Sequence, residues 1–306
     1  MSEPQSGVLP AASRHAIFLT LTLASEMGAG ARVRQVAAQL PVLTRALAQL
    51  EPEGKVGSVL GVGAAAWQTV FGGDLPAGLA PFEPFEDGGR SAPATPADLL
   101  LHVRAERMDL CFELVRQLRR VFAGAVSAVE EVHCFRYLDS RDLTGFVDGT
   151  ENPQTDEDRR AVALVAEGPF AGGSHVDVQR YIHDLPKWEA LSVPEQEQII
   201  ARTKAENVEF SAEFKPPTAH IKRVSIKEDG VSLEMLRHSL PYGTAEEHGL
   251  YFASYTGRPD VFPRMLERMV VADGEGHYDH LLDYSRAVTG ARFFAPPGDW
   301  LEAQGQ

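Results

Sequence analysis

Apolar segments recur along the chain in an order that restricts its fold, and that order occurs twice. The predicted strands show apolar residues in alternation or short runs, and the predicted helices show them every three to four residues. In the first half we expect, in this order, a strand at 15–23, a helix at 31–50, strands at 56–62 and 98–103, a helix at 108–122 and a strand at 126–137. Between the middle strands, residues 72–96 are rich in Gly, Pro and Ala and predict a long surface loop.

The second half repeats this order of elements without visible sequence identity to the first. We expect strands at 175–182, 233–238, 250–255 and 291–294 and helices at 194–204 and 263–270. Two strand–helix–strand–strand–helix–strand units predict an α+β fold of duplicated ferredoxin-like units, with antiparallel sheets and peripheral helices. We place the N-terminal unit at 1–144 and the C-terminal unit at 145–306.

Charge and cysteine content exclude several classes of protein. The chain has 29 Lys and Arg against 43 Asp and Glu, a formal net charge of -14, which disfavours nucleic acid and anionic membranes as partners. Cys111 and Cys134 lie in apolar, periodic surroundings, which indicates buried thiols. No CxxCH occurs, which excludes covalent haem attachment. The first 15 residues have no apolar signal-peptide core, and no apolar run reaches membrane-spanning length, so we expect a cytoplasmic protein.

The string GFVDGTENP, Gly145 to Pro153, places one acid, Asp148, inside a Gly-rich turn. An isolated Asp-Gly pair is usually an ordinary turn. Here Gly145 and Gly149 bracket the acid, and glycine permits positive φ or close approach to a ligand. Asn152 and Pro153 end the turn. We therefore interpret the string as a loop that directs a carboxylate into a cavity.

Three polar residues further along the chain are candidates for the same cavity. His220 follows the rigid sequence KPPTA and precedes a basic pair, Lys222 and Arg223. A lone histidine is more often a hydrogen-bonded surface or core group than a ligand. Arg237 lies on a predicted strand, and Ser239, two residues on, is expected on the same face.

Together, GFVDGTENP, TAHIKRVSIKEDG, LPYGT and HGLYFASY resemble the dye-decolourising peroxidases, with the closest similarity to their B-type bacterial branch. The resemblance covers nearly the whole chain and is strongest from residue 135 to 297. It implies non-covalently bound haem b, with His220 as the axial ligand of the iron. It also implies a peroxidase that reduces hydrogen peroxide and oxidises organic donors, such as dyes and phenols, by one-electron steps. Asp148 and Arg237 are the expected catalytic residues, with Ser239 at a position where other B-type members often have Asn.

The resemblance suggests further contacts. An axial histidine normally donates its second ring N–H to an acid or a carbonyl. Asp279 is the preferred acid, from the family pattern in HYDHLLDYS, and Asp283 is the alternative. The other expected haem contacts are Gly149, Thr150, Arg223 and Phe252. An aspartate base with its ordinary pKa near about 3.9 predicts peroxidase activity that persists into mildly acidic solution.

Other interpretations stay open at this point. A haem-processing protein that oxidises porphyrinogens or releases haem iron, or a non-catalytic haem carrier, would share the same motifs. His277, His280 and Asp283 have the spacing of a loose zinc or iron site. Four aromatic residues are candidates for electron relay, although core packing is the simpler role for each: Trp188, Tyr242, Tyr255 and Trp300. The family implies a homo-oligomer, and because the chain ends at Gln306 we expect no tail that docks it into an encapsulin nanocompartment.

Overall fold

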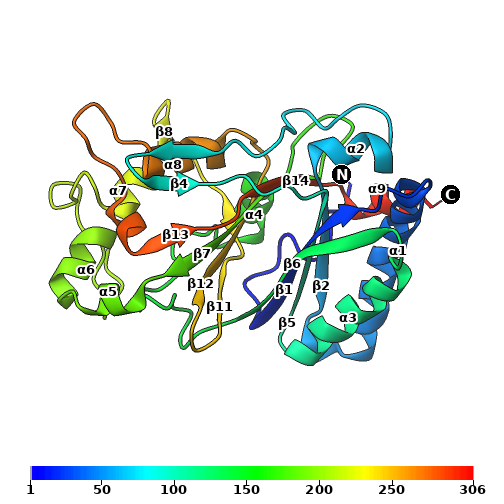
Figure 1. Ribbon diagram of the computed structural model, residues 1–306, viewed down its shortest axis with the longest axis horizontal. Helices are drawn as coiled ribbons and strands as arrows, with labels where there is room; N and C mark the ends of the chain where they lie inside the picture. Colours follow the sequence, from blue (N-terminus) through cyan, green and yellow to red (C-terminus); the bar gives the residue numbers. More distant parts are fainter. Residues whose placement is uncertain (1, 306) are drawn as a thin grey trace.

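The computed structural model describes residues 2–305, and most of its strands form one large antiparallel sheet that closes on itself (Figure 1). Around the closed part the order is β12-β11-β6-β1-β5-β2-β14-β7, and β7 pairs back with β12. Two short strands, β10 and β13, extend this sheet beside β12 and β7. The strands of this sheet are β1 His15–Leu23, β2 Gly57–Val62, β5 Leu99–Ala105, β6 Val126–Phe135, β7 Ser174–His183, β10 Leu236–Arg237, β11 Leu240–Gly243, β12 His248–Thr256, β13 Ser285–Ala287 and β14 Ala291–Ala295.

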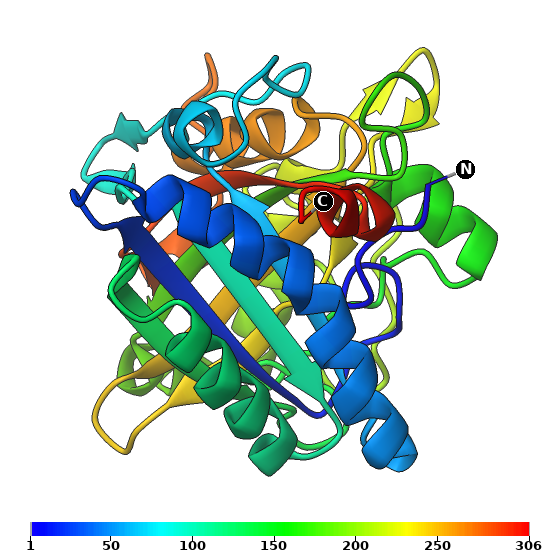
Figure 2. The same ribbon diagram turned by 90° about the vertical axis from the view of Figure 1, so that its right-hand side faces the viewer.

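Helices lie outside this barrel and cover its outer faces (Figures 1 and 2). The helices are α1 Ala29–Leu50, α2 Ala64–Val70, α3 Met108–Val121, α4 Asp156–Ala163, α5 Leu185–Glu189, α6 Val193–Ile200, α7 His220–Val224, α8 Val261–Val270 and α9 Gly298–Ala303, with short 3₁₀ turns at Pro52–Gly54 and His280–Asp283. Figure 2 shows α1 and α3 side by side across the outer face of β1 and β5. Between residues 2 and 305, no helix has the length and apolar character that crossing a membrane requires.

Alternation along the strands separates two apolar cores. On β1, Phe18 faces the barrel interior, where it packs among buried residues of several other strands. Its neighbours Ile17 and Leu19 face outward into the core that α1, α2, α3 and α9 cover. Successive side chains point to opposite faces of a strand, so a strand buried on both faces reads as a nearly continuous apolar run. The C-terminal half has separate apolar clusters around α8 and around α5 and α6.

The predicted antiparallel strands and peripheral helices are confirmed, but the closure of the sheet was not predicted. Strands of the two halves pair at two places, β14 with β2 and β11 with β6, so that eight strands form one barrel. The sequence pattern indicates which face of a strand is apolar, and it carries no signal for which strand edges pair across the halves.

Several local predictions are corrected. The loop predicted at 72–96 contains a hairpin, β3 Phe85–Asp87 with β4 Arg90–Ala92. The strand predicted at 233–238 is shortened to the two residues of β10. Before it, β9 Val231–Ser232 forms a separate hairpin with β8 Lys227–Glu228. Helices α4 and α7 and strands β11 and β13 are too short to give a clear periodic pattern.

Candidate active site

A cavity of about 810 Å³ lies on the outer face of β12, between this strand, the loop that carries Asp148, and helices α7 and α8. Its volume falls within the range of small-molecule and cofactor sites, about 300–1,000 Å³. Leu250 and Phe252 of β12 contribute to one wall, and Phe252 stacks on Phe262 of α8 with ring centroids 5.2 Å apart. Further apolar lining comes from Ile226, Met265, Leu266, Met269, Leu281 and Leu282. The cavity is therefore an apolar slot with polar groups at defined positions.

The Gly-rich turn directs Asp148 into this cavity. Gly145 has φ of 88° and Gly149 has φ of 75°, so both occupy the left-handed region that favours glycine, as predicted. A Cβ at Gly145 would also lie 2.5 Å from Cε of Lys204. The Asp148 backbone N–H donates to the Ser140 carbonyl at 2.9 Å, and the Asp148 carboxylate accepts from the Gly149 N–H at 2.7 Å. These contacts fix the orientation of the carboxylate.

Arg237 lies beside Asp148, at the end of β10, and both line the cavity. Burial raises the pKa of the Asp148 carboxyl above its usual value, and the nearby Arg237 charge opposes that rise. The sequence interpretation assumed an ordinary aspartate pKa, so this assumption is corrected. Ser239 also lines the cavity, although β10 ends before it, and its hydroxyl accepts from the Ala253 N–H at 3.3 Å.

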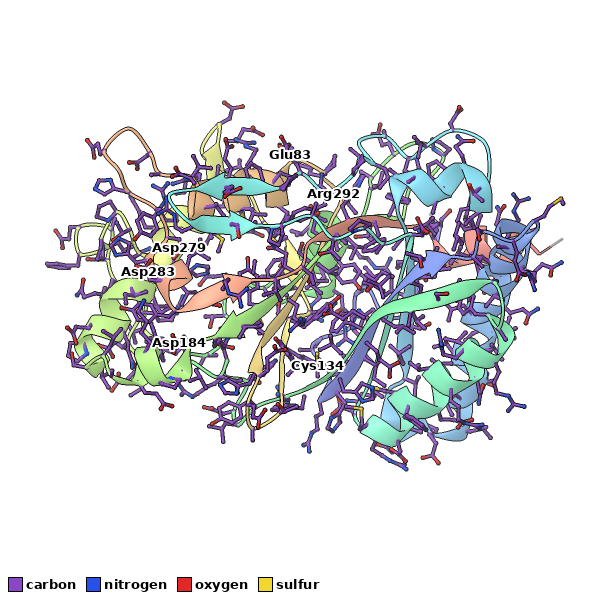
Figure 3. The ribbon with its side chains drawn as sticks, viewed as in Figure 1. Glu83, Cys134, Asp184, Asp279, Asp283 and Arg292 are labelled. Carbon is purple, nitrogen blue, oxygen red and sulfur yellow. The ribbon has the colours of Figure 1, made fainter. Side chains whose placement is uncertain are left out.

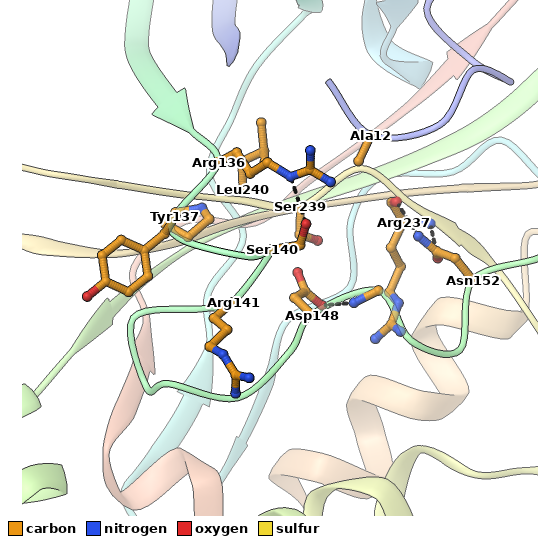
Figure 4. Close-up of a pocket in the computed structure, with 12 residues that line it drawn as sticks. Ala12, Arg136, Tyr137, Ser140, Arg141, Asp148, Asn152, Arg237, Ser239 and Leu240 are labelled. Atoms are coloured by element: carbon orange, nitrogen blue, oxygen red, sulfur yellow. Dashed lines mark hydrogen bonds between the residues drawn. The ribbon is translucent and has the colours of Figure 1, made fainter. Parts of the chain in front are cut away.

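Four residues separate this cavity from a second, much smaller pocket of about 40 Å³ (Figure 4). Asp148, Gly149, Arg237 and Ser239 line both spaces. Forty cubic ångströms accommodate only water-sized molecules. Asp148 and Arg237 therefore lie between the large cavity and a space that holds only water-sized molecules.

His220 approaches the cavity as the first residue of α7. Its Nδ1 lies 2.6 Å from Oδ2 of Asp279, which is fully buried. The other carboxylate oxygen of Asp279 accepts from the Leu281 N–H at 3.0 Å. With a carboxylate as its partner, Nδ1 carries the proton and Nε2 carries the lone pair that a metal requires.

Asp283 has a different environment, although Figure 3 shows it in the same part of the molecule as Asp279. Asp283 is exposed, and its carboxylate accepts from the Tyr278 hydroxyl at 3.2 and 3.3 Å. The spacing of acids in HYDHLLDYS did not distinguish the two residues. Their burial does, because Asp279 begins the 3₁₀ turn with its side chain inward and Asp283 ends it with its side chain outward.

Of the four other residues predicted to contact haem, three line the cavity and one does not. Gly149, Thr150 and Phe252 line the cavity, as expected of haem contacts. Arg223 does not, because its guanidinium pairs with Asp273 at 2.8 Å and donates to backbone carbonyls. Besides Arg237, the Lys and Arg residues that line the cavity are Arg202, Lys215, Lys222, Lys227 and Arg268. Of these five, the sequence analysis had pointed only to Lys222, as part of the basic pair after His220.

The candidate relay aromatics pack against other residues, and the described part of the chain does not form the alternative metal site. Trp188, Tyr242 and Tyr255 are buried in core clusters, and Trp300 stacks on Trp67. Within residues 2–305, no group of three or more His, Cys, Asp or Glu side chains is arranged to hold a metal ion.

The cavity fits a haem group by the chemistry of its lining. Much of its lining is apolar, its basic residues suit the carboxylates of a porphyrin, and the His220 imidazole is held by the buried acid Asp279. Asp148 and Arg237 provide a proton acceptor and a fixed positive charge in the same space.

Comparison with known proteins gives one consistent result. Residues 5–136 match the family described as "Dyp-type peroxidase, N-terminal", and residues 139–300 match "Dyp-type peroxidase, C-terminal". A dye-decolorizing peroxidase from Mycolicibacterium paratuberculosis is 43% identical over 291 residues, which are 94% of this chain and 82% of that protein. A DypB variant from Rhodococcus jostii RHA1, solved in complex with heme, aligns with a TM-score of 0.94 and 42% identity over 98% of each chain. The encapsulated DyP-type peroxidase from Mycobacterium smegmatis aligns with a TM-score of 0.94 and 41% identity, covering 99% of this chain and 98% of that one.

Proposed function

Because this chain belongs to the dye-decolourising peroxidase family, we propose that His220, Asp148 and Arg237 are the residues with which it carries out a peroxidase reaction. The protein is a haem-dependent peroxidase that uses hydrogen peroxide as oxidant. One observation carries the residue assignment: a single apolar cavity is lined by an imidazole backed by a buried acid and by a carboxylate next to a guanidinium.

Each residue has a chemical role that follows from its position. Haem b, when bound, supplies the iron at which peroxide is reduced and stores oxidising equivalents for one-electron donors. His220 would hold the iron through Nε2, and Asp279 would keep the proton on Nδ1 and increase the basicity of the ring. Asp148 would accept a proton from one oxygen of hydrogen peroxide and return it to the other as the O–O bond breaks and water leaves. Arg237 stabilises the negative charge that develops on the departing oxygen.

The other lining residues complete the site. Ser239 offers a hydroxyl on the Asp148 side of the cavity, and Gly149 and Thr150 bring backbone close to the bound group. Phe252, supported by Phe262, provides a flat apolar contact for a porphyrin face. We assign the carboxylates of the haem to the basic residues Lys222, Lys227 and Arg268 in place of Arg223.

The assignment is tested by stopped-flow reaction of the haem-loaded protein with hydrogen peroxide. Loss of a fixed charge or donor at the reacting oxygen costs on the order of 10² to 10³ in rate, so Asp148→Ala and Arg237→Leu should both be slow. Asp156→Ala is the matched control, because this nearby carboxylate is 94% exposed. If both site variants react at the rate of the unaltered protein, the protein binds haem without using these residues. If only Asp148→Ala is slow, the role given to Arg237 is wrong.

We also infer that the barrel is built from two ferredoxin-like units, 1–144 and 145–306. The four main strands of the first half lie in the order β6-β1-β5-β2, and those of the second half in the order β14-β7-β12-β11. Each order is fourth, first, third, second by chain position, as in a ferredoxin-like sheet. Co-expression of the two segments as separate chains tests this, with recovery of a haem-binding complex expected. Failure of either segment to associate would count against two units with this boundary.

We further propose a cytoplasmic homo-oligomer that takes hydrogen peroxide and small organic donors. The oligomer is proposed from the family to which the chain belongs. Analytical ultracentrifugation should give a mass that is a multiple of 33.4 kDa. A monomer at micromolar concentration would contradict the oligomer.

A further inference from the structure

Asn152, the eighth residue of GFVDGTENP, lies against the backbone of Arg237. Its Oδ1 accepts from the Arg237 N–H at 2.9 Å, and its Nδ2 donates to the Arg237 carbonyl at 2.9 Å (Figure 4). These are the two hydrogen bonds that a neighbouring strand would make. One side-chain amide therefore holds β10 from the side opposite its pairing with β12.

The same residue is fixed to the turn that carries Asp148. The Asn152 backbone N–H donates to the Gly149 carbonyl at 3.0 Å, and a Cβ at Gly149 would lie 3.3 Å from Nδ2 of Asn152. The Gly149 N–H in turn donates to the Asp148 carboxylate at 2.7 Å. A single tight turn thus carries Asp148 at one end and Asn152 at the other. Arg237, which the Asn152 amide holds, lies 85 residues further along the chain.

We infer that Asn152 is a positioning residue of the peroxidase reaction, which fixes the Arg237 guanidinium relative to the Asp148 carboxylate through the backbone of β10. The inference rests on the roles proposed above for Arg237 and Asp148. Asparagine is specifically suited to this task because it presents a donor and an acceptor side by side. Aspartate would place an oxygen against the Arg237 carbonyl, alanine would remove both bonds, and glutamine would displace the amide by one methylene.

Displacement of Arg237 has an electrostatic signature that a general loss of folding lacks. Burial raises the pKa of Asp148, and the Arg237 charge opposes that rise more than any other neighbour. Asp142 adds to the rise, and the Gly149 N–H and His220 oppose it, but the Asn152 side chain holds none of these three. If Arg237 moves away, this opposition weakens and the pKa of Asp148 rises further. The peroxide reaction requires the carboxylate, so its acid limb should move to higher pH.

The experiment compares Asn152→Ala and Asn152→Asp with Gln154→Ala in the haem-loaded protein. Gln154 is an exposed neighbour in the same loop and contacts only the Asn152 carbonyl by a side-chain hydrogen bond, which makes it the matched control. A misplacement of about 1 Å can cost about 10²-fold in rate. We expect about this loss in the rate with peroxide for both Asn152 variants, an acid limb at higher pH, and no change for Gln154→Ala.

A second measurement does not depend on turnover. Fluoride binds ferric haem as an anion and shifts its absorption, and a fixed positive charge favours it. Asn152→Ala and Arg237→Leu should both weaken fluoride binding. If Asn152→Ala does not take up haem, Asn152→Asp provides the comparison, because it keeps the side-chain volume and the acceptor.

The double variant Asn152→Ala/Arg237→Leu separates the two proposals. If Asn152 acts through Arg237, its substitution changes neither rate, acid limb nor fluoride affinity once Arg237 is absent. Full effects that persist in the Arg237→Leu background would overturn the positioning role. Should Arg237→Leu alone leave all three quantities unchanged, the proposed role of Arg237 itself fails. An unchanged Asn152→Ala beside an affected Arg237→Leu overturns only the inference about Asn152.

Discussion

Replacement of Asp279 by Asn tests how the protein holds its axial histidine. In the native protein the carboxylate accepts two hydrogen bonds, from His220 Nδ1 at 2.6 Å and from the Leu281 N–H at 3.0 Å. An amide of the same size has only one acceptor atom. If its oxygen faces Leu281, its NH₂ group faces Nδ1 and the imidazole must move its proton to Nε2, which removes the lone pair that binds iron. If the oxygen faces His220, the NH₂ group meets the Leu281 N–H and leaves that donor without an acceptor.

The second orientation preserves ligation, so its cost sets the size of the effect. A buried donor left unpaired costs about 1–3 kcal/mol, and a bond to a neutral acceptor is about 1 kcal/mol weaker than one to a carboxylate. Together the two costs come to about 3 kcal/mol, which corresponds to roughly 150-fold in haem affinity, at about 1.4 kcal/mol for each factor of ten. The neutral partner should also raise the reduction potential of the iron, because an anionic partner favours the ferric state.

Titration of haem-free protein with hemin, followed by the Soret absorption, measures the affinity. Asp283→Asn is the matched control, because this acid lies four residues away and is exposed. Within residues 2–305 its carboxylate hydrogen-bonds only to the Tyr278 hydroxyl, so its replacement should leave affinity and potential unchanged. Equal hemin affinities for the two variants would refute the account of the His220–Asp279 pair.

Three further predictions follow from burial and backbone geometry. Burial raises the pKa of Asp148, and the carboxyl group must be deprotonated to act. The rate of the peroxide reaction should therefore be full above this pKa and should fall at a higher pH than for an ordinary aspartate. Stopped-flow rates between about pH 3 and 8 measure this fall. Asp177 is fully buried and pairs with Arg292 at 2.7 Å, so Arg292→Leu should lower the free energy of unfolding by about 3–5 kcal/mol in urea titration, and Asp177→Leu in the same chain should restore most of it. Gly145→Ala forces a side chain into positive φ and onto Lys204, and should lower thermal stability and the peroxide rate together, whereas Gly274→Ala, in open space without positive φ, should change neither.

The sequence allows much of this architecture to be predicted, for identifiable reasons. His15–Leu23 and Met108–Val121 are long elements with strong apolar patterns, and the structure places both within one residue of the prediction. The closure of the barrel depends on pairing of strand edges, and short elements such as α7 bury too few residues to leave a period. Apolar periodicity therefore identifies which face of a long helix or strand is buried, but it does not show which strand edges pair.

The site shows the same division between local and long-range information. The positive φ angles at Gly145 and Gly149 could be predicted from residue type, because few other residues tolerate positive φ. Arg223 was misplaced because its basic character is visible in sequence while its pairing with Asp273 is not. Asn152 looked like a turn residue, and only the three-dimensional contact with Arg237 reveals its second use.

The central claim is that a haem iron is bound by His220 in the cavity opposite Asp148 and Arg237. The most direct measurement is the absorption spectrum of the purified protein after addition of hemin, compared between the unaltered chain and His220→Ala. The control is His248→Ala, at the first residue of β12, which does not line the cavity. We predict an intense Soret band from the unaltered chain and from His248→Ala, and a band that is lost or changed to that of weakly held hemin in His220→Ala. An identical spectrum for all three proteins would contradict the account.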